Sequence, residues 1–204
     1  MHAILSSLIQ TVNFSGSIPR DAAAFLNHHG HPKTAVHCGQ VADTASQLAQ
    51  RFGADPQGAA VAGWMHDISA VFPNPQRLEA AKALSLDILP EEESVPQLLH
   101  QKISAVMAEE LFGVADPEVL GAIGCHTTLR PDPTSMDLVL FVADKISWDQ
   151  KGVPPYADRL SSALARSLEE AAWVYQDYLW HSGKLKITHP WMRASYHDLR
   201  RKYG

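Results

Sequence analysis

The chain has 204 residues, of which 46% are hydrophobic and 19% are charged, and its formal net charge is −5. This length and composition are typical of a globular protein that buries a core without disulfide cross-links. The acidic balance and the lack of a basic stretch argue against a duplex-binding surface, so no nucleic-acid partner is expected.

The N-terminal segment lacks a basic stretch and a small-residue cleavage site, and it does not resemble a signal peptide. No apolar run approaches the roughly 18 residues that a membrane-spanning helix needs, so no membrane partner is expected. Only two cysteines are present, Cys38 and Cys125, and they form no disulfide framework. We therefore expect a reducing, cytoplasmic location.

The predicted elements are all helices. Pro32 opens a helix that runs to Phe52, and Gly53 ends it, because proline favours the first turn and glycine the position just past the end. In chain order, further helices are expected over residues 55–67, 76–84, 96–112, 116–126, 134–144, 157–180 and 190–201, and the acidic run 91–93 is expected to be a solvated helix start or loop.

No segment shows a convincing period-two strand pattern. The fold class predicted from the sequence is therefore all-α, a helical bundle. Residues 1–204 are expected to form a single domain, with a core over about 32–150 and C-terminal helices over about 156–202.

The unusual feature is the count of 11 histidines, because imidazole is costly in a core unless it is hydrogen-bonded or bound to a metal. A helix places residues three and four positions apart on one face. That spacing puts one ionisable group on the apolar stripe of each of five helices. These groups are His37, His66, His100, His126 and Asp144, and Asp67 directly follows His66.

One histidine on an apolar stripe is more often a hydrogen-bonded core residue than a metal ligand. Four imidazoles and two carboxylates in one interior, however, call for compensating positive charge. One or two divalent cations would supply it, and this ligand set suits Fe, Mn, Zn, Co or Ni. Asp67 is the natural bridge between two metals, because a carboxylate has two oxygens.

The order His37, His66-Asp67, Asp144 resembles the HD-domain metal-dependent phosphohydrolases. Further segments resemble the YqeK-type branch over roughly Thr34 to Leu199. The matching segments are Ala35-Val36-His37, Trp64-Met65-His66-Asp67, Leu98-Leu99-His100, Cys125-His126-Thr127-Thr128-Leu129-Arg130-Pro131, Phe141-Val142-Ala143-Asp144-Lys145-Ile146 and Ile187-Thr188-His189-Pro190.

The resemblance implies an HD-domain fold and symmetrical hydrolysis of diadenosine tetraphosphate to two ADP at a di-iron centre, with manganese or another transition metal as alternatives. It implies that the first metal is bound by His37, His66, Asp67 and Asp144. It implies that the second metal is bound by Asp67, His100 and His126. Thr127 and Arg130 match polar substrate contacts, and Asp67, Thr127 and Arg130 are the candidate catalytic residues.

Two departures from the family pattern concern the substrate. Ala70 stands where the family commonly has a lysine, and residues 146–151 lack the usual acidic and arginine-containing sequence. Arg130 and one of Lys102, Lys145 or Lys151 would offset the phosphate charge.

Three alternatives stay open at this point. The chain could be another HD nucleotide phosphatase, a non-catalytic sensor that binds metal and nucleotide, or a helical bundle with a polar core and no metal. A homodimer is also open, because the aromatic stretch over 173–180 could pack internally or form a dimer contact.

Overall fold

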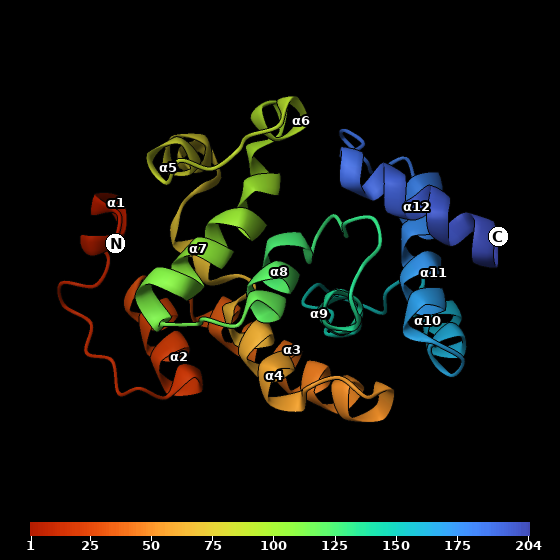
Figure 1. The fold of residues 1–204 in the computed structure, drawn as a ribbon, viewed down its shortest axis with the longest axis horizontal. Helices are drawn as coiled ribbons and strands as arrows, with labels where there is room; N and C mark the ends of the chain where they lie inside the picture. The colour runs from red at the N-terminus through yellow and green to blue at the C-terminus, as the bar shows by residue number, and fades with distance from the viewer.

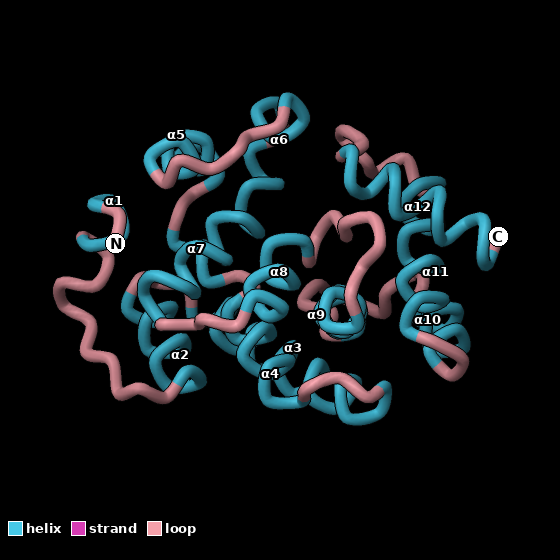
Figure 2. Tube along the Cα trace, viewed as in Figure 1, coloured by secondary structure: helices cyan, strands magenta, loops and turns pink.

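The computed structural model describes residues 1–204 and contains helices and loops but no strand (Figure 2). Three short 3-10 helices lie at Ile68–Val71, Asn74–Gln76 and Pro96–Leu99. The α-helices are α1 (Ala3–Ser6), α2 (Ile18–His28), α3 (Pro32–Phe52), α4 (Pro56–Met65), α5 (Arg77–Ala83), α6 (Pro90–Ser94), α7 (His100–Phe112), α8 (Pro117–Cys125), α9 (Ser135–Ile146), α10 (Ala157–Leu164), α11 (Leu168–His181) and α12 (Pro190–Tyr203).

The predicted all-α class is confirmed, and several helix ends follow from local capping. Gly53 ends α3 in the left-handed region, with a φ of 79° that glycine adopts without strain. The side chains of Asp55, Asp116 and Thr134 accept hydrogen bonds from backbone N–H groups at the starts of α4, α8 and α9. These boundaries lie within two residues of those predicted.

Helices α3 and α4 pack against each other at very short range. Gly63 of α4 lies so close to α3 that a Cβ atom there would be 2.4 Å from the Cα of Ala42. This close approach brings the C-terminal end of α4 beside the first turns of α3. Helix α9 packs against both of them, and α8 packs against α4, α7 and α9.

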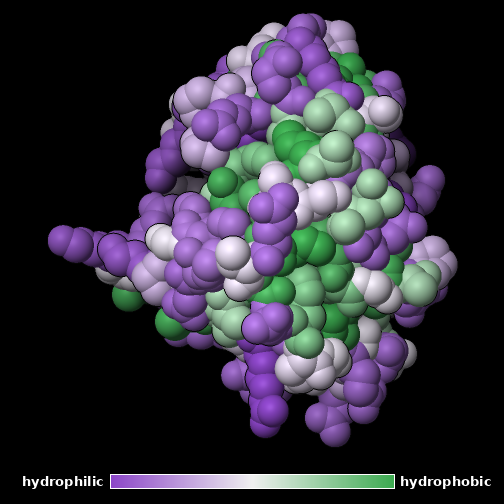
Figure 3. All heavy atoms as spheres, turned by 90° about the vertical axis from the view of Figure 1, so that its left-hand side faces the viewer, coloured by the Kyte–Doolittle hydropathy of each residue, from purple (hydrophilic) through white to green (hydrophobic).

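A hydrophobic cluster of 44 buried residues extends from Leu5 to Leu199. Helices α10 to α12 group at one end of the molecule, the N-terminal helices lie at the other, and α9 lies between (Figure 1). On the N-terminal face, hydrophobic residues occupy a central band between polar ones (Figure 3). No helix combines the length and the apolar character needed to cross a bilayer.

The predicted helix over 157–180 is wrong, because the structure divides it into α10 and α11. Ser167 between them has an extended backbone, and its hydroxyl accepts a hydrogen bond from the N–H of Glu170 to cap α11. A serine competes with the helix for backbone hydrogen bonds, which favours a new start. The aromatic stretch packs internally, with Tyr175 against Phe141.

The acidic run is also not fully solvated as predicted, because Glu92 is completely buried. One carboxylate oxygen accepts from Lys102 Nζ (2.7 Å) and from the N–H of Leu89 (2.9 Å), and the other lies 3.4 Å from His189 Nε2. Burial alone would raise the pKa of Glu92, but the hydrogen bonds from His189, Leu89 and Lys102 outweigh burial and lower it. The bonds of Glu92 to Lys102 and His189 thus connect α6 to α7 and to the start of α12.

Glu92→Gln is expected to lower the free energy of unfolding by about 3 kcal/mol at pH 7, because it leaves the Lys102 ammonium without its buried partner. The folded-state pKa of Glu92 is depressed, so its contribution is full above the unfolded pKa of about 4.3 and disappears as the pH falls through the lower folded value. Urea unfolding at pH 7 and pH 3 measures this, with the exposed Glu93→Gln as control. A difference from wild type that is equally large at pH 3 would contradict the prediction.

Candidate metal centre

Six side chains from different parts of the chain converge at one place in the interior. His37 lies near the start of α3, His66 ends α4 and Asp67 follows it. The others are His100 at the start of α7, His126 at the end of α8 and Asp144 late in α9. The four imidazoles form a row in the order His37, His66, His126, His100, with successive ring centroids 5.1, 4.9 and 4.9 Å apart.

Three of the imidazoles share one hydrogen-bonding pattern. The Nδ1 atoms of His66 and His126 each lie 2.8 Å from the carbonyl oxygen three residues earlier, and the corresponding distance for His100 is 2.6 Å. A carbonyl oxygen can only accept, so each Nδ1 carries the proton and donates it. With Nδ1 bonded in this way, Nε2 of each ring is the nitrogen that faces the interior, which is the arrangement in which an imidazole binds a metal.

Two of these Nε2 atoms lack a hydrogen-bond donor that would explain their burial, those of His66 and His126. His66 Nε2 is buried without a hydrogen-bond partner, and the Nε2 atoms of His100 and His126 lie 3.1 Å apart. Burial lowers the pKa of His100 and of His126, for His126 well below its usual range. Protonation is thus disfavoured where positive charge is needed, and a divalent cation fits the arrangement.

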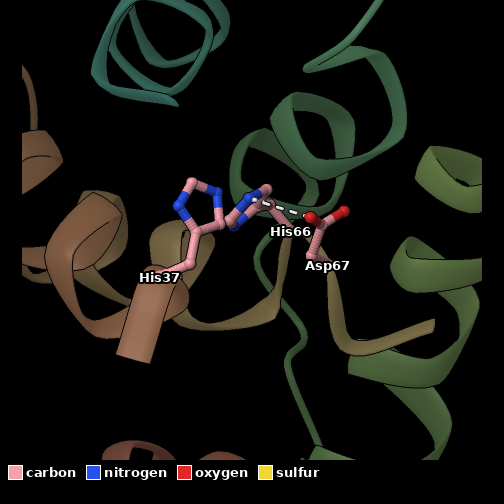
Figure 4. Close-up of side chains that lie close together, drawn as sticks. All are labelled: His37, His66 and Asp67. Atoms are coloured by element: carbon pink, nitrogen blue, oxygen red, sulfur yellow. Dashed lines mark ion pairs between the residues drawn. The ribbon is translucent and has the colours of Figure 1, made fainter. Parts of the chain in front are cut away.

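The two carboxylates face this row from both sides. One oxygen of Asp67 lies 3.6 Å from His66 Nε2, and the other lies 3.5 Å from His100 Nε2 and 3.8 Å from His126 Nε2. Figure 4 shows His66 between His37 and the Asp67 carboxylate. Asp144 Oδ1 lies 3.2 Å from His37 Nε2. Asp67 belongs to two of the three donor groups whose atoms all lie within 4.8 Å of one another.

Both carboxylates are held in the anionic form that a metal requires. Burial would raise the pKa of Asp67, but the positive charge that His66, His100 and His126 carry when protonated outweighs burial and lowers the pKa to about 2. Burial likewise opposes ionisation of Asp144, but the adjacent Lys145 ammonium lowers its pKa well below the usual range. Lys145 bonds Asp144 Oδ2, which leaves Oδ1 directed toward His37.

Of the two candidate substrate contacts, Thr127 lies at the central cavity and Arg130 does not. The Thr127 hydroxyl lies 3.0 Å from His100 Nε2 and donates to it, and Thr127 lines the cavity over the cluster. Arg130 does not reach this cavity. Its guanidinium forms a two-point ion pair with Asp137, with N–O distances of 2.7 and 3.1 Å, because the fully buried Asp137 carboxylate needs a positive partner.

The candidate lysines also have other contacts. Lys102 bonds Glu92, Lys145 bonds Asp144, and Lys151 lines none of the cavities near the cluster. Lys145 alone of these lines the central cavity, but its charge is already shared with Asp144.

Sequence reasoning missed two residues that shape the site. Arg77 donates to the carbonyl oxygen of Gln97, which also accepts from His100 Nδ1. The buried Gln101 accepts from the N–H of Thr127 at 3.1 Å and so orients the turn after His126. A polar residue directly after His100 was a weak sign for Gln101. Arg77 gave none, because its contact with Gln97 joins residues 20 positions apart and depends on tertiary packing.

The cluster is open to small molecules through a central cavity of about 310 Å³. Its lining includes His37, Asp67, His100 and Asp144, so the donor groups face the cavity. The arrangement can hold one or two divalent cations beside a bound ligand, and it leaves room for a substrate that contacts them.

Comparison with known proteins places residues 34–149 in the HD domain family. An uncharacterized protein of Lactococcus lactis subsp. cremoris is 45% identical over 141 residues, which are 69% of this chain and 72% of that protein. The symmetrical bis(5'-nucleosyl)-tetraphosphatase of Bacillus subtilis is 34% identical over 54% of this chain, and the match spans only 59% of that enzyme.

A solved structure has the same fold. The crystal structure of a protein from Clostridium acetobutylicum, described as a predicted HD superfamily hydrolase involved in NAD metabolism, matches with a TM-score of 0.81. The match covers 90% of this chain and 97% of that one, at 24% identity. At this identity the likeness concerns the fold alone.

Proposed function

This chain belongs to the HD domain family, and from that premise we propose that it cleaves diadenosine tetraphosphate symmetrically to two ADP at a two-metal centre. The observation that carries the proposal is the set of three imidazoles whose Nδ1 atoms are bonded to backbone carbonyls and whose Nε2 atoms face two carboxylates beside one cavity. The broader assignment, a metal-dependent phosphohydrolase, follows from the family.

The proposed ligands divide into two groups that share one residue. His37, His66, Asp67 and Asp144 would hold the first cation, and Asp67, His100 and His126 the second. The two oxygens of Asp67, which point to opposite halves of the imidazole row, support the bridging role. When bound, divalent cations activate water and offset the charge that develops on the phosphoryl oxygens.

Other residues of the chain orient the proposed metal ligands. Lys145 holds one oxygen of Asp144 and so directs the other toward His37. The carbonyl oxygens of Gly63, Gln97 and Ile123 fix the ring orientations of His66, His100 and His126. The Thr127 hydroxyl lines the cavity, and once His100 Nε2 binds a metal the hydroxyl proton would be free to bond a phosphate oxygen. In this proposal Arg130 does not contact the substrate, and its guanidinium forms the ion pair with Asp137 instead.

The metal is proposed to be iron, since imidazole with carboxylate suits it, with manganese or another transition metal as a substitute. We propose a cytoplasmic location, because both Cys38 and Cys125 are free and buried. The substrate assignment is supported by the name of the Bacillus subtilis relative.

Removal of metal with a chelator is expected to abolish hydrolysis, and addition of Fe²⁺ or Mn²⁺ is expected to restore it, because the cluster offers no other source of positive charge at the reacting phosphate. The measurement is chromatography of the products of diadenosine tetraphosphate, with elemental analysis of the same samples. ADP should be the only product.

Other outcomes separate the alternatives. Release of free phosphate from a mononucleotide, without cleavage of the dinucleotide, would assign the chain to another HD phosphatase activity. Nucleotide binding without turnover would indicate a sensor. Iron- or manganese-loaded protein that hydrolyses neither a dinucleoside polyphosphate nor a nucleotide would refute the proposed function.

A further inference from the structure

Two further cavities adjoin the central one, at opposite ends of the imidazole row. The first, of about 590 Å³, shares His37, Asp67, Trp148 and Asp149 with the central cavity. The second, of about 270 Å³, shares Gln97, His100 and Thr127 with it. The two outer cavities have no lining residue in common. Together the three form a groove that passes over the cluster from the His37 end to the His100 end.

The outer cavity at the His37 end combines one basic residue with exposed apolar surface. Its lining includes Lys33, Val36, which is 63% exposed, and Trp148, together with the carboxylates of Asp67 and Asp149. Lys33 forms no ion pair within the protein. An indole and an aliphatic side chain suit the flat face of a nucleobase, and the ammonium suits a phosphate.

The outer cavity at the His100 end has the same combination, built from different elements. Its apolar walls come from the segment before α7, from the last turn of α11 and from the loop between α11 and α12, and they are Val95, Leu98, Leu179, Leu185 and Ile187. Lys184 and Lys186 from the same loop add positive charge. Lys184 donates to the Tyr178 hydroxyl at 3.0 Å, whereas Lys186 forms no ion pair.

The combination of apolar walls with the unpaired Lys186 has no evident role in stabilising the fold. Lys186 is exposed and forms no ion pair, and it stands at the edge of apolar walls, so its ammonium is free to meet the anionic group of a ligand. A ligand with an apolar face and an anionic group satisfies both. The cavity opens beside His100 and Thr127, so the anionic group of such a ligand would lie next to the proposed metals.

On the basis of the proposed function, we propose that the two outer cavities are separate nucleoside subsites. The cavity with Lys186 holds one half of a substrate that has two nucleosides. The linear polyphosphate lies over the imidazole row, and the second nucleoside occupies the cavity with Lys33 and Trp148. This arrangement selects dinucleoside polyphosphates over mononucleotides, because a mononucleotide fills only one end of the groove.

The test uses the full-length, Mn²⁺-loaded protein and measures ADP binding by calorimetry together with the KM and kcat for diadenosine tetraphosphate. Wild type is expected to bind two ADP per chain. Lys186→Glu should weaken one of these sites about tenfold or more and raise the KM by a similar factor, with kcat changed less than twofold, because charge reversal repels the phosphates. Lys33→Glu should weaken the other site.

Two further variants sharpen the assignment. Leu185→Trp fills the apolar wall without changing charge, and it should weaken the same ADP site as Lys186→Glu. Lys151→Glu carries the same charge change on an exposed lysine that lines none of the three cavities, and it should leave both sites within twofold of wild type. Thermal unfolding of each variant establishes that it is folded.

The outcomes separate this inference from the proposed function. Binding of a single ADP per chain, or equal responses to Lys186→Glu and Lys151→Glu, would overturn the inference even if hydrolysis is observed. Weakening by Lys186→Glu without any effect of Leu185→Trp would overturn the nucleoside subsite, because only a phosphate contact would then be present. Two ADP sites that respond separately in a protein without hydrolysis would support the inference and refute the proposed function.

Discussion

His126→Ala is expected to reduce kcat for diadenosine tetraphosphate by about 10³-fold and to reduce the metal content from two ions per chain to one. His126 is 1% exposed, and its Nδ1 is already bonded to the carbonyl oxygen of Ile123, so its Nε2 is the atom that would bind the second metal beside Asp67 and His100. Elemental analysis and steady-state kinetics on the same preparations measure the two effects.

Asp67→Asn provides the comparison for this prediction. If Asp67 bridges, its loss should release both ions, whereas His126→Ala should release one. His181→Ala, on an exposed helix end away from the cluster, serves as control and should change neither quantity. Full metal content and undiminished kcat in His126→Ala would show that this imidazole is a core residue and not a ligand.

Gly63→Ala is expected to lower the free energy of unfolding by about 3 kcal/mol or more, because the added methyl would overlap the backbone of α3. Its Cβ would lie 2.4 Å from the Cα and 2.5 Å from the N of Ala42, and backbone atoms cannot move aside as a flexible side chain can. Urea unfolding followed by circular dichroism measures the change. Activity should fall as well, because separation of α3 and α4 moves His37 away from His66.

Gly124→Ala is the matched control within α8. There the nearest atom to an added Cβ is the Cβ of Ala105 at 3.9 Å, which is an ordinary contact. Alanine is the better helix former, so this variant should be more stable than wild type by about 0.5–1 kcal/mol. Equal effects of the two substitutions would contradict the close packing of α3 and α4.

The positions of most helix ends could be predicted from the sequence because they depend on neighbours along the chain. The proline at the start of α3, the glycine after it and the side-chain caps at Asp55, Asp116 and Thr134 all act within a few residues. The division at Ser167 was missed, because a serine cap competes with helix continuation and only the surrounding packing decides between them.

The chain itself determined which helix faces carry imidazole and carboxylate groups, because helical periodicity is a local property. It therefore indicated that His37, His66, Asp67, His100, His126 and Asp144 would point inward, and they do lie together. The tertiary structure alone decided the partners of the other polar groups. The buried Glu92 carboxylate contacts Lys102 and His189, and the Arg130 guanidinium bonds Asp137.

The groove across the cluster likewise could not be predicted from the sequence. Its two ends are built from Lys33 and Trp148, and from Val95 and Lys186, which are separated by roughly a hundred residues of chain. Local spacing carries no information about which distant segments meet. Such contacts depend on how the helices pack, and here that packing determines where a substrate can lie relative to the metal ligands.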